Sequence, residues 1–130
     1  MIEFHLSSRS GLSPYQQLVQ QVRHALRLGV LAIGDRLPTV KEVSQQLAIN
    51  PNTVLKAYRE LEYDGLIAAR PGVGTFVTHT LADGSLASLG PLRKDLQRWL
   101  TKARLAGLDE ESIEALFITT FRGNAGEEIA

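Results

Sequence analysis

The most chemically informative side chains of this sequence recur every three or four residues along residues 51–63. That spacing places them on one side of a helix: Asn52, Lys56, Arg59 and Tyr63. Side-chain amides and cations match base edges and phosphates of DNA, and this stripe contains no acid. The inward side of the same helix is predicted to be Val54, Ala57, Tyr58 and Leu61. An ordinary solvated helix also has a polar stripe, so the neighbouring elements must decide between the two interpretations.

Two helix-start signals lie before and at the beginning of this segment. Thr39 and Glu42 have the spacing of a capping box, which predicts a short first helix. Asn50 and Pro51 predict the start of a second helix, and Gly65 is placed to end it. Because only about three residues separate the helices, they must cross sharply, as in a helix-turn-helix. The second helix, with its polar stripe, is then the candidate recognition helix.

The composition after Gly65 changes to that of a β-hairpin, with strands expected near residues 66–70 and 75–78. Gly72 and Gly74 in the turn permit positive φ and also allow the backbone to approach a ligand. A simple turn would explain the two glycines equally well. Arg70 adds a cation at the turn, and together with the helix-turn-helix it indicates a wing that lies along DNA.

These motifs resemble the GntR family of bacterial transcription regulators. The matching runs are Gly34-Asp35-Arg36-Leu37-Pro38-Thr39, Asn52-Thr53-Val54 and Pro71-Gly72-Val73-Gly74-Thr75-Phe76-Val77. The run at 50–54 is most similar to the YtrA-like subfamily. The resemblance covers about the first 80 residues. It implies a DNA-binding regulator, and the family favours repression over activation. It also implies a homodimer formed through a short helical tail, without a large effector domain, that often controls a transporter operon.

The motifs and the resemblance together predict a set of contacts to a double-stranded DNA operator: Arg36, Thr39, Lys41, Asn50, Asn52, Thr53, Lys56, Arg59, Arg70, Gly72 and Gly74. The net charge of the whole chain gives little support for DNA binding, because 14 basic residues balance 14 acidic ones. Residues 1–80 hold 8 Lys/Arg against 6 Asp/Glu, whereas residues 81–130 hold 6 against 8. The small basic excess therefore belongs to the predicted DNA-binding half.

An additional helix is predicted ahead of the helix-turn-helix. Ser13, Pro14 and Gln16 form another capping signal, and Gly29 is placed to end the helix. Before it, the alternating apolar residues within 1–12 suggest a short strand or a packed arm. We expect residues 1–80 to form one winged helix-turn-helix domain.

The C-terminal part is predicted to be a linker at 81–90, a two-helix dimerisation hairpin at 91–123 and a flexible end at 124–130. Gly107 separates the two helices, and Asp109 caps the second. Their apolar stripes supply the expected dimerisation residues: Leu92, Leu96, Trp99, Leu100, Ile113, Leu116, Phe117 and Phe121. A short hairpin cannot bury these stripes alone. The partner is either the winged domain of the same chain or, as we favour, the hairpin of a second chain.

The predicted fold class is thus mainly α with a small β-hairpin. The sequence has no cysteine, signal peptide or long apolar run, which favours a cytoplasmic protein with no membrane partner. Its three histidines lack metal-ligand spacing, and no nucleophile or nucleotide-binding motif is present, so we expect no enzyme, metal or cofactor. An effector, if there is one, is not identified. A winged helix that binds protein rather than DNA is the alternative function.

Overall fold

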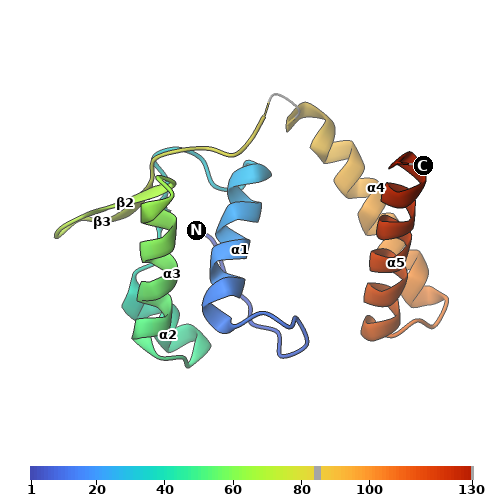
Figure 1. Ribbon diagram of the computed structural model, residues 1–130, viewed down its shortest axis with the longest axis horizontal. Helices are drawn as coiled ribbons and strands as arrows, with labels where there is room; N and C mark the ends of the chain where they lie inside the picture. Colours follow the sequence, from blue (N-terminus) through green and yellow to red (C-terminus); the bar gives the residue numbers. More distant parts are fainter. Residues whose placement is uncertain (84–85, 130) are drawn as a thin grey trace. The chain divides into compact units, whose positions relative to one another are not determined.

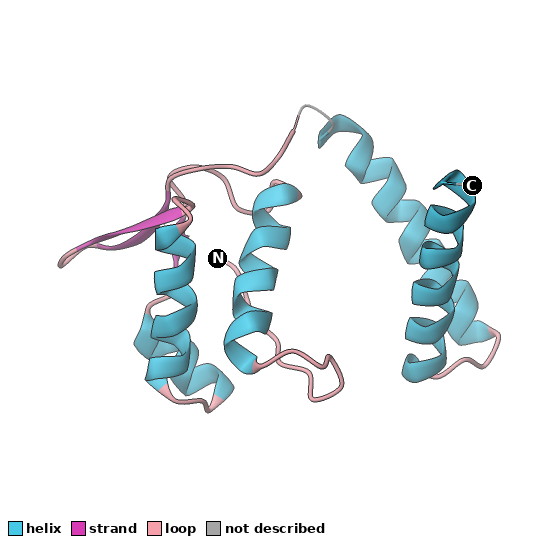
Figure 2. Cartoon of the chain, in the orientation of Figure 1, coloured by secondary structure: helices cyan, strands magenta, loops and turns pink. Residues whose placement is uncertain are grey.

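The computed structural model describes the backbone of residues 1–83 and 86–129, and the side chains of residues 1–83 and 89–123. The chain divides into two compact units. The winged unit comprises Met1–Leu86, and the tail unit begins at residue 87. The described strands all belong to the winged unit, whereas the tail unit is helical (Figure 2). The predicted fold class, mainly α with a winged helix-turn-helix, is confirmed.

Helix α1, Pro14–Arg27, begins and ends at the predicted signals. The Ser13 hydroxyl accepts from the Gln16 backbone N–H, the Gln16 side chain accepts from the Ser13 N–H, and Gly29 follows the helix with φ +72°. The first residues form a packed arm and contain no strand. Phe4 of this arm is buried in the core. Of the two predicted alternatives, the packed arm is therefore the one observed.

Glutamine side chains of α1 form hydrogen bonds to the backbone of the N-terminal arm, as a neighbouring strand would. The Gln17 amide accepts from the Ser7 N–H at 2.8 Å and donates to the carbonyls of Ser7 and Leu12 at 2.9 and 3.0 Å. Gln21 likewise accepts from the His5 N–H and donates to the His5 carbonyl. These bonds satisfy backbone groups that have no ladder partner.

Helix α2 spans Val40–Leu47 and helix α3 spans Pro51–Tyr63, with the short connection predicted between them. Thr39 and Glu42 form the complete capping box, and the Asn50 side chain caps α3. Ala48 makes the turn in the left-handed region, with φ +54°. Helices α1, α2 and α3 enclose the core, whose fully buried side chains include Leu18, Val22, Val43, Val54 and Leu61.

The wing is part of a three-stranded antiparallel sheet. Strand β2, Ile67–Arg70, and strand β3, Gly74–Val77, form the predicted hairpin, which projects away from the helices (Figure 1). A third strand, β1, consists only of Arg36–Leu37 and pairs with β3, so the order is β1-β3-β2. Arg36 lies opposite Phe76, and Leu37 opposite Thr75. The sheet therefore joins the base of the wing to the residues that precede α2.

The tail unit contains α4, Leu86–Leu105, and α5, Glu110–Ile129. Gly107, with φ +91°, follows α4, and the Asp109 carboxylate accepts from the Ser112 N–H, as the sequence predicts. Both helices are longer than expected, because α4 starts inside the predicted linker and α5 extends past 123. Pro91 lies within α4, whereas it was predicted to begin the helix. Proline disfavours a helical conformation at the residue before it, but in this structure that residue is also part of the helix. Residue 130 lies outside the described residues.

Candidate nucleic-acid interface

Helix α3 presents the predicted polar stripe to solvent. Its inner side chains, Val54, Ala57, Tyr58 and Leu61, are all buried, and this prediction is confirmed. The four stripe residues are all exposed: Asn52, Lys56, Arg59 and Tyr63. Tyr63 is 91% exposed, so the polar stripe continues to the end of the helix as a solvent-facing surface.

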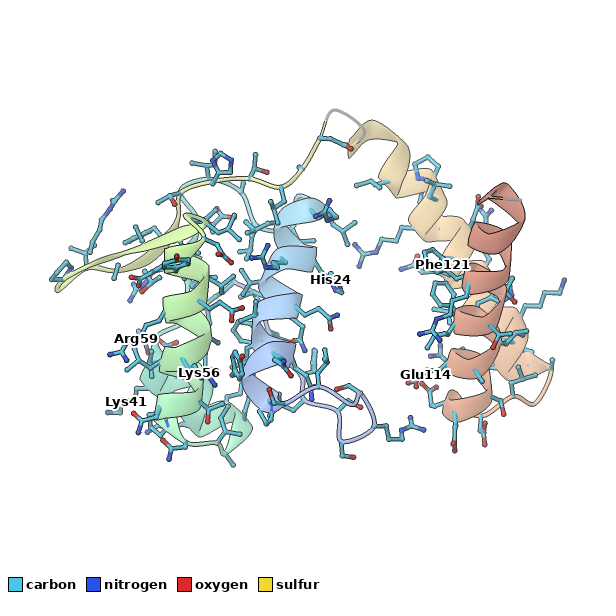
Figure 3. All side chains as sticks on the ribbon, viewed as in Figure 1. His24, Lys41, Lys56, Arg59, Glu114 and Phe121 are labelled. Atoms are coloured by element: carbon cyan, nitrogen blue, oxygen red, sulfur yellow. The ribbon has the colours of Figure 1, made fainter. Side chains whose placement is uncertain are left out.

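The cations of the stripe point to different sides of α3. The Lys56 ammonium lies 3.9 Å from the centre of the Tyr15 ring, which belongs to α1. Arg59 lies on the side of α3 away from α1, where Lys41 of α2 is also found (Figure 3). Lys56 is thus at the α1 edge of the candidate interface, and Arg59 and Lys41 are at the opposite edge. The sequence placed Lys56 and Arg59 in one stripe, and only the structure separates them.

Several of the predicted contact residues are at helix N-termini, and the side chains of two of them, Thr39 and Asn50, are engaged in capping. The Thr39 hydroxyl accepts from the Glu42 N–H at 3.1 Å and donates to the Glu42 carboxylate at 3.0 Å. The Asn50 amide oxygen accepts from the Asn52 N–H at 2.8 Å. Thr53 lies in the first turn of α3 and is half-buried. Thr39 and Asn50 therefore fix the ends of the two helices that present the interface.

A buried tyrosine fixes α3 against the entrance of α2. The Tyr58 hydroxyl donates to the Pro38 carbonyl at 2.6 Å, and the ring is 3% exposed. Burial, with a smaller contribution from the Glu42 carboxylate, raises the pKa of Tyr58 above its ordinary value. Both effects favour the neutral phenol, which is the hydrogen-bond donor. The sequence predicted Tyr58 to face inward, but it did not identify the partner of its hydroxyl.

One face of the wing sheet carries two arginines around an aromatic ring. Residues opposite each other in an antiparallel pair, and residues two apart on a strand, share a face. By the observed register, this face contains Arg36, Ala68, Arg70, Gly74 and Phe76. The Arg70 guanidinium carbon lies 4.7 Å from the centre of the Phe76 ring, and both arginines are exposed.

The two predicted wing glycines are required for different reasons. Gly72 has φ +74° and follows Pro71 in a turn closed by the Val73 N–H and the Arg70 carbonyl, at 2.9 Å. Nothing lies within 4 Å of a Cβ built on Gly72, so only its backbone conformation calls for glycine. Gly74 has φ +146°, and a Cβ there would lie 3.0 Å from Nε of Arg36. Gly74 therefore also leaves space for the Arg36 side chain.

Another cation of the winged unit has a structural partner. Arg23 of α1 forms an ion pair with Asp64, the C-cap residue of α3, and so links these two helices. Among the residues that the structure describes, no group of three or more His, Asp or Glu residues is placed to hold a metal ion. Within the same part of the chain, no helix is long and apolar enough to span a membrane.

The predicted dimerisation residues form an apolar surface on the tail unit. Most of them are exposed or half-buried, and Leu92 and Phe121 are the most open, at 60% and 66%. Trp99, Phe117 and Phe121 form a continuous aromatic row, with ring centres 6.4 and 6.1 Å apart. Ile113 differs because it is 5% exposed and belongs to the interior of the hairpin.

Comparison with known proteins connects this geometry to a family. The family model described as "Bacterial regulatory proteins, gntR family" matches residues 14–77. The "HTH-type transcriptional repressor YtrA" of Bacillus subtilis (strain 168) is 33% identical over 112 residues, covering 83% of this chain and 84% of that protein. The residues matched by the family model, 14–77, contain the helix-turn-helix and the wing.

Solved structures agree with the sequence comparison. YtrA from Sulfolobus acidocaldarius, a GntR-family transcription factor, has 26% sequence identity and a TM-score of 0.54, covering 75% of this chain and 97% of that chain. The structure of AraR(DBD) in complex with operator ORE1 has 28% identity and a TM-score of 0.50, covering 60% and 95% of the two chains. A similar fold is therefore known bound to an operator.

Proposed function

The chain belongs to the GntR family and is a DNA-binding transcriptional regulator; from this premise we propose that it is a repressor that binds a palindromic operator as a homodimer. The repressor role is supported by the name of the Bacillus subtilis relative. The observation that carries the proposal is that one winged unit exposes both an acid-free polar stripe on α3 and a wing face with two arginines. A recognition helix and a wing with these side chains suit a major groove and its flanking phosphates.

Within this interface we assign different roles to different side chains. Asn52, exposed in the first turn of α3, is our candidate for base recognition, together with Lys41 and Arg59 on the outer edge. Lys56 at the α1 edge and Arg70 on the wing are our candidates for phosphate contacts. Arg36, Thr53, Gly72 and Gly74 complete the proposed surface, and Thr39 and Asn50 contribute by fixing the helix ends.

The homodimer is supported by the exposed apolar surface of the tail unit. Among its described side chains, only Ala103 and Ile113 are buried. Large apolar side chains left open on a helical hairpin favour a partner that covers them. A twofold pair of chains would present two recognition helices about 34 Å apart, which is the spacing of successive major-groove faces. A palindromic operator has the same symmetry.

The experiment that tests the proposal is selection of duplexes from random DNA by the full chain, followed by fluorescence anisotropy over a salt series. We expect a palindromic site whose binding survives random competitor DNA and follows the concentration of dimer. Arg70→Ala should weaken binding and reduce the salt slope by about 2, because each of the two chains of the dimer would lose one phosphate contact. Arg27→Ala is the matched control, because this exposed arginine is in the last turn of α1, outside the proposed surface.

The outcome also separates DNA binding from the protein-binding alternative. Failure to select any duplex would contradict the proposal and favour a winged helix that binds protein. The family resemblance favours a transporter operon as the target and the cytoplasm as the place of action. Transcript measurements in a deletion strain test the first of these: derepression of transporter genes is the expected result.

A further inference from the structure

We propose that Tyr15 and Phe76 are positioning residues for DNA binding, because each ring holds one phosphate-contacting cation, Lys56 or Arg70, in place before DNA arrives. This inference rests on the proposed function and adds two residues to it. Neither aromatic residue is among the DNA contacts predicted from sequence. Each acts through the cation that it holds.

Tyr15 is a fixed support for Lys56. It is the second residue of α1, half-buried, and packed against the hydrophobic core of the winged unit. The Lys56 ammonium lies 3.9 Å from the ring centre, within the range of a cation–π contact. Lys56 itself is exposed and lies between α3 and α1 (Figure 3). The ring thus holds a solvent-accessible ammonium at the α1 edge of the recognition helix.

Phe76 has the same relation to Arg70. Phe76 is half-buried in β3, the central strand, where Arg36 and Ala68 are its neighbours on either side. Arg70 ends β2, and its guanidinium carbon lies 4.7 Å from the Phe76 ring centre. A central strand is paired on both sides, so the ring has little freedom to move. The exposed guanidinium is thereby held against the face of the sheet.

An aromatic support leaves the positive charge available for DNA. In the described part of the chain, Lys56 and Arg70 form no ion pair with a carboxylate, and each contacts a ring. A carboxylate would neutralise the cation and would have to be displaced by an incoming phosphate. A ring orders the long side chain without removing its charge. Because less rotamer freedom is then lost on binding, the contact with phosphate should be stronger.

The free protein provides a direct measurement of the first contact. In NMR spectra of the full chain, the protons of the Lys56 side chain next to the ammonium should be shifted upfield by the ring current of Tyr15. The shift should persist in Tyr15→Phe, which keeps the ring, and disappear in Tyr15→Leu. Unshifted Lys56 protons in the wild-type chain would overturn the assignment of Tyr15.

The binding test uses a labelled duplex selected from random DNA by the wild-type chain. We expect Tyr15→Leu and Phe76→Leu each to raise the Kd of the dimer about 4- to 25-fold, because each of the two chains would lose one exposed cation–π contact worth about two- to fivefold. Tyr15→Phe and Phe76→Tyr, which keep their rings, should bind as the wild type does. In a Lys56→Ala background, Tyr15→Leu should have no further effect, and Phe76→Leu should have none in an Arg70→Ala background.

These double substitutions distinguish positioning from general stability. A variant that merely weakened the fold would lose affinity in both backgrounds, and that result would overturn the proposal. Equal Kd values for ring-keeping and ring-free variants would also overturn it. The proposed function would stand in that case, because the wild-type chain would still have selected a specific duplex. If the wild-type chain selects no duplex at all, the proposed function fails, and the role of the rings in DNA binding fails with it.

Discussion

Tyr58 links the two helices of the helix-turn-helix through its buried hydroxyl. Its hydroxyl bonds the Pro38 carbonyl across 20 positions of sequence, and so ties the middle of α3 to the entrance of α2. A shift of α3 relative to α2 would move the polar stripe relative to Lys41. The contact is buried, which makes the loss of either partner costly.

We predict that Tyr58→Phe lowers the free energy of unfolding by about 1–2 kcal/mol, because the Pro38 carbonyl loses its buried donor. Urea denaturation followed by circular dichroism measures this. Tyr63→Phe is the matched control, since Tyr63 is 91% exposed, and it should change the free energy by less than about 0.5 kcal/mol. Equal effects of the two substitutions would contradict the structural role of the Tyr58 hydroxyl.

The raised pKa of Tyr58 predicts a specific loss of stability in alkali. Burial keeps the folded phenol protonated above the ordinary tyrosine pKa of about 10, so the folded state binds the proton more tightly than the unfolded state. The contribution is complete below pH of about 10 and is lost as the pH rises beyond it. Urea titrations between pH 8 and 11 should therefore show a steeper decline for wild type than for Tyr58→Phe. Parallel declines would contradict burial as the cause.

At the same scale, the sequence predicted which side chains of α3 face outward and which face inward, but not their contacts with other elements. Helical spacing placed Lys56 and Arg59 outside and Tyr58 inside, and the structure agrees. Spacing within a helix says nothing about a partner such as Tyr15, which is 41 positions away from Lys56. The contacts of Tyr15, Phe76 and Arg36 depend on how elements pack, so they could not be predicted from local pattern.

Among the elements, the turn between α2 and α3 is made without glycine. Ala48 has φ +54°, and among the described residues no other non-glycine has a positive φ. Side chains with a Cβ are strained in this region by roughly 1–2 kcal/mol. The turn is therefore held by its surroundings, including the Ile49 N–H, which donates to the Ser44 carbonyl at 3.1 Å.

We predict that Ala48→Gly raises the free energy of unfolding by about 0.5–1 kcal/mol, since relief of strain exceeds the added entropy of the unfolded chain. The urea midpoint measures the change. Ala32→Gly, at an exposed loop position without positive φ, should lower stability slightly. A destabilised Ala48→Gly would show that the methyl group makes a contact worth more than the strain.

The N-terminal arm gives a second prediction at this scale. Gln17→Ala should lower the free energy of unfolding by about 2–3 kcal/mol, because three hydrogen bonds to the arm are lost in a buried setting. Hydrogen exchange at the Ser7 amide should become faster. The neighbouring Gln20 is exposed, so Gln20→Ala should leave both measurements unchanged. Unaltered exchange at Ser7 in Gln17→Ala would contradict this account of the arm.

Helices with cap signals were predicted closely, because a cap is a local chemical feature. The sequence alone predicts Ser13, Thr39, Asn50 and Asp109 as N-caps, and each side chain accepts from a backbone N–H of its helix. Strand β1 was missed because two residues carry no periodicity, and its existence depends on pairing with β3. The arm was ambiguous for a related reason: alternating apolar residues fit a strand, and only the glutamines of α1 complete its hydrogen bonds in another way.

For the whole molecule, the proposed homodimer depends on the tail unit, which would bring two recognition helices together. We predict that Phe121→Asp converts the dimer to a monomer, because Phe121 is 66% exposed at the end of the aromatic row and would be covered by the second chain. Sedimentation velocity measures the change. Binding to the selected duplex should weaken strongly, because each monomer then contacts one half-site.

The control places the same charge elsewhere on the tail unit. Gln97→Asp, at an exposed position of α4 outside the predicted dimerisation residues, should leave a dimer. The urea midpoint of the winged unit should be the same in both variants, because the substitutions lie outside Met1–Leu86. A dimeric Phe121→Asp would contradict the proposed interface and favour burial of the tail against the winged unit of its own chain.

The pairing of β1 with β3 has a consequence for the order of events during protein synthesis. Arg36 and Phe76 are neighbours in the sheet but are separated by the whole helix-turn-helix. A nascent chain therefore carries β1 without its partner until translation has passed the wing. Domains form as units beginning from the N-terminal side, so the winged unit closes before the apolar helices of the tail are complete. In the proposed dimer, each chain would therefore complete its DNA-binding unit before it completes the helices that pair it with a second chain.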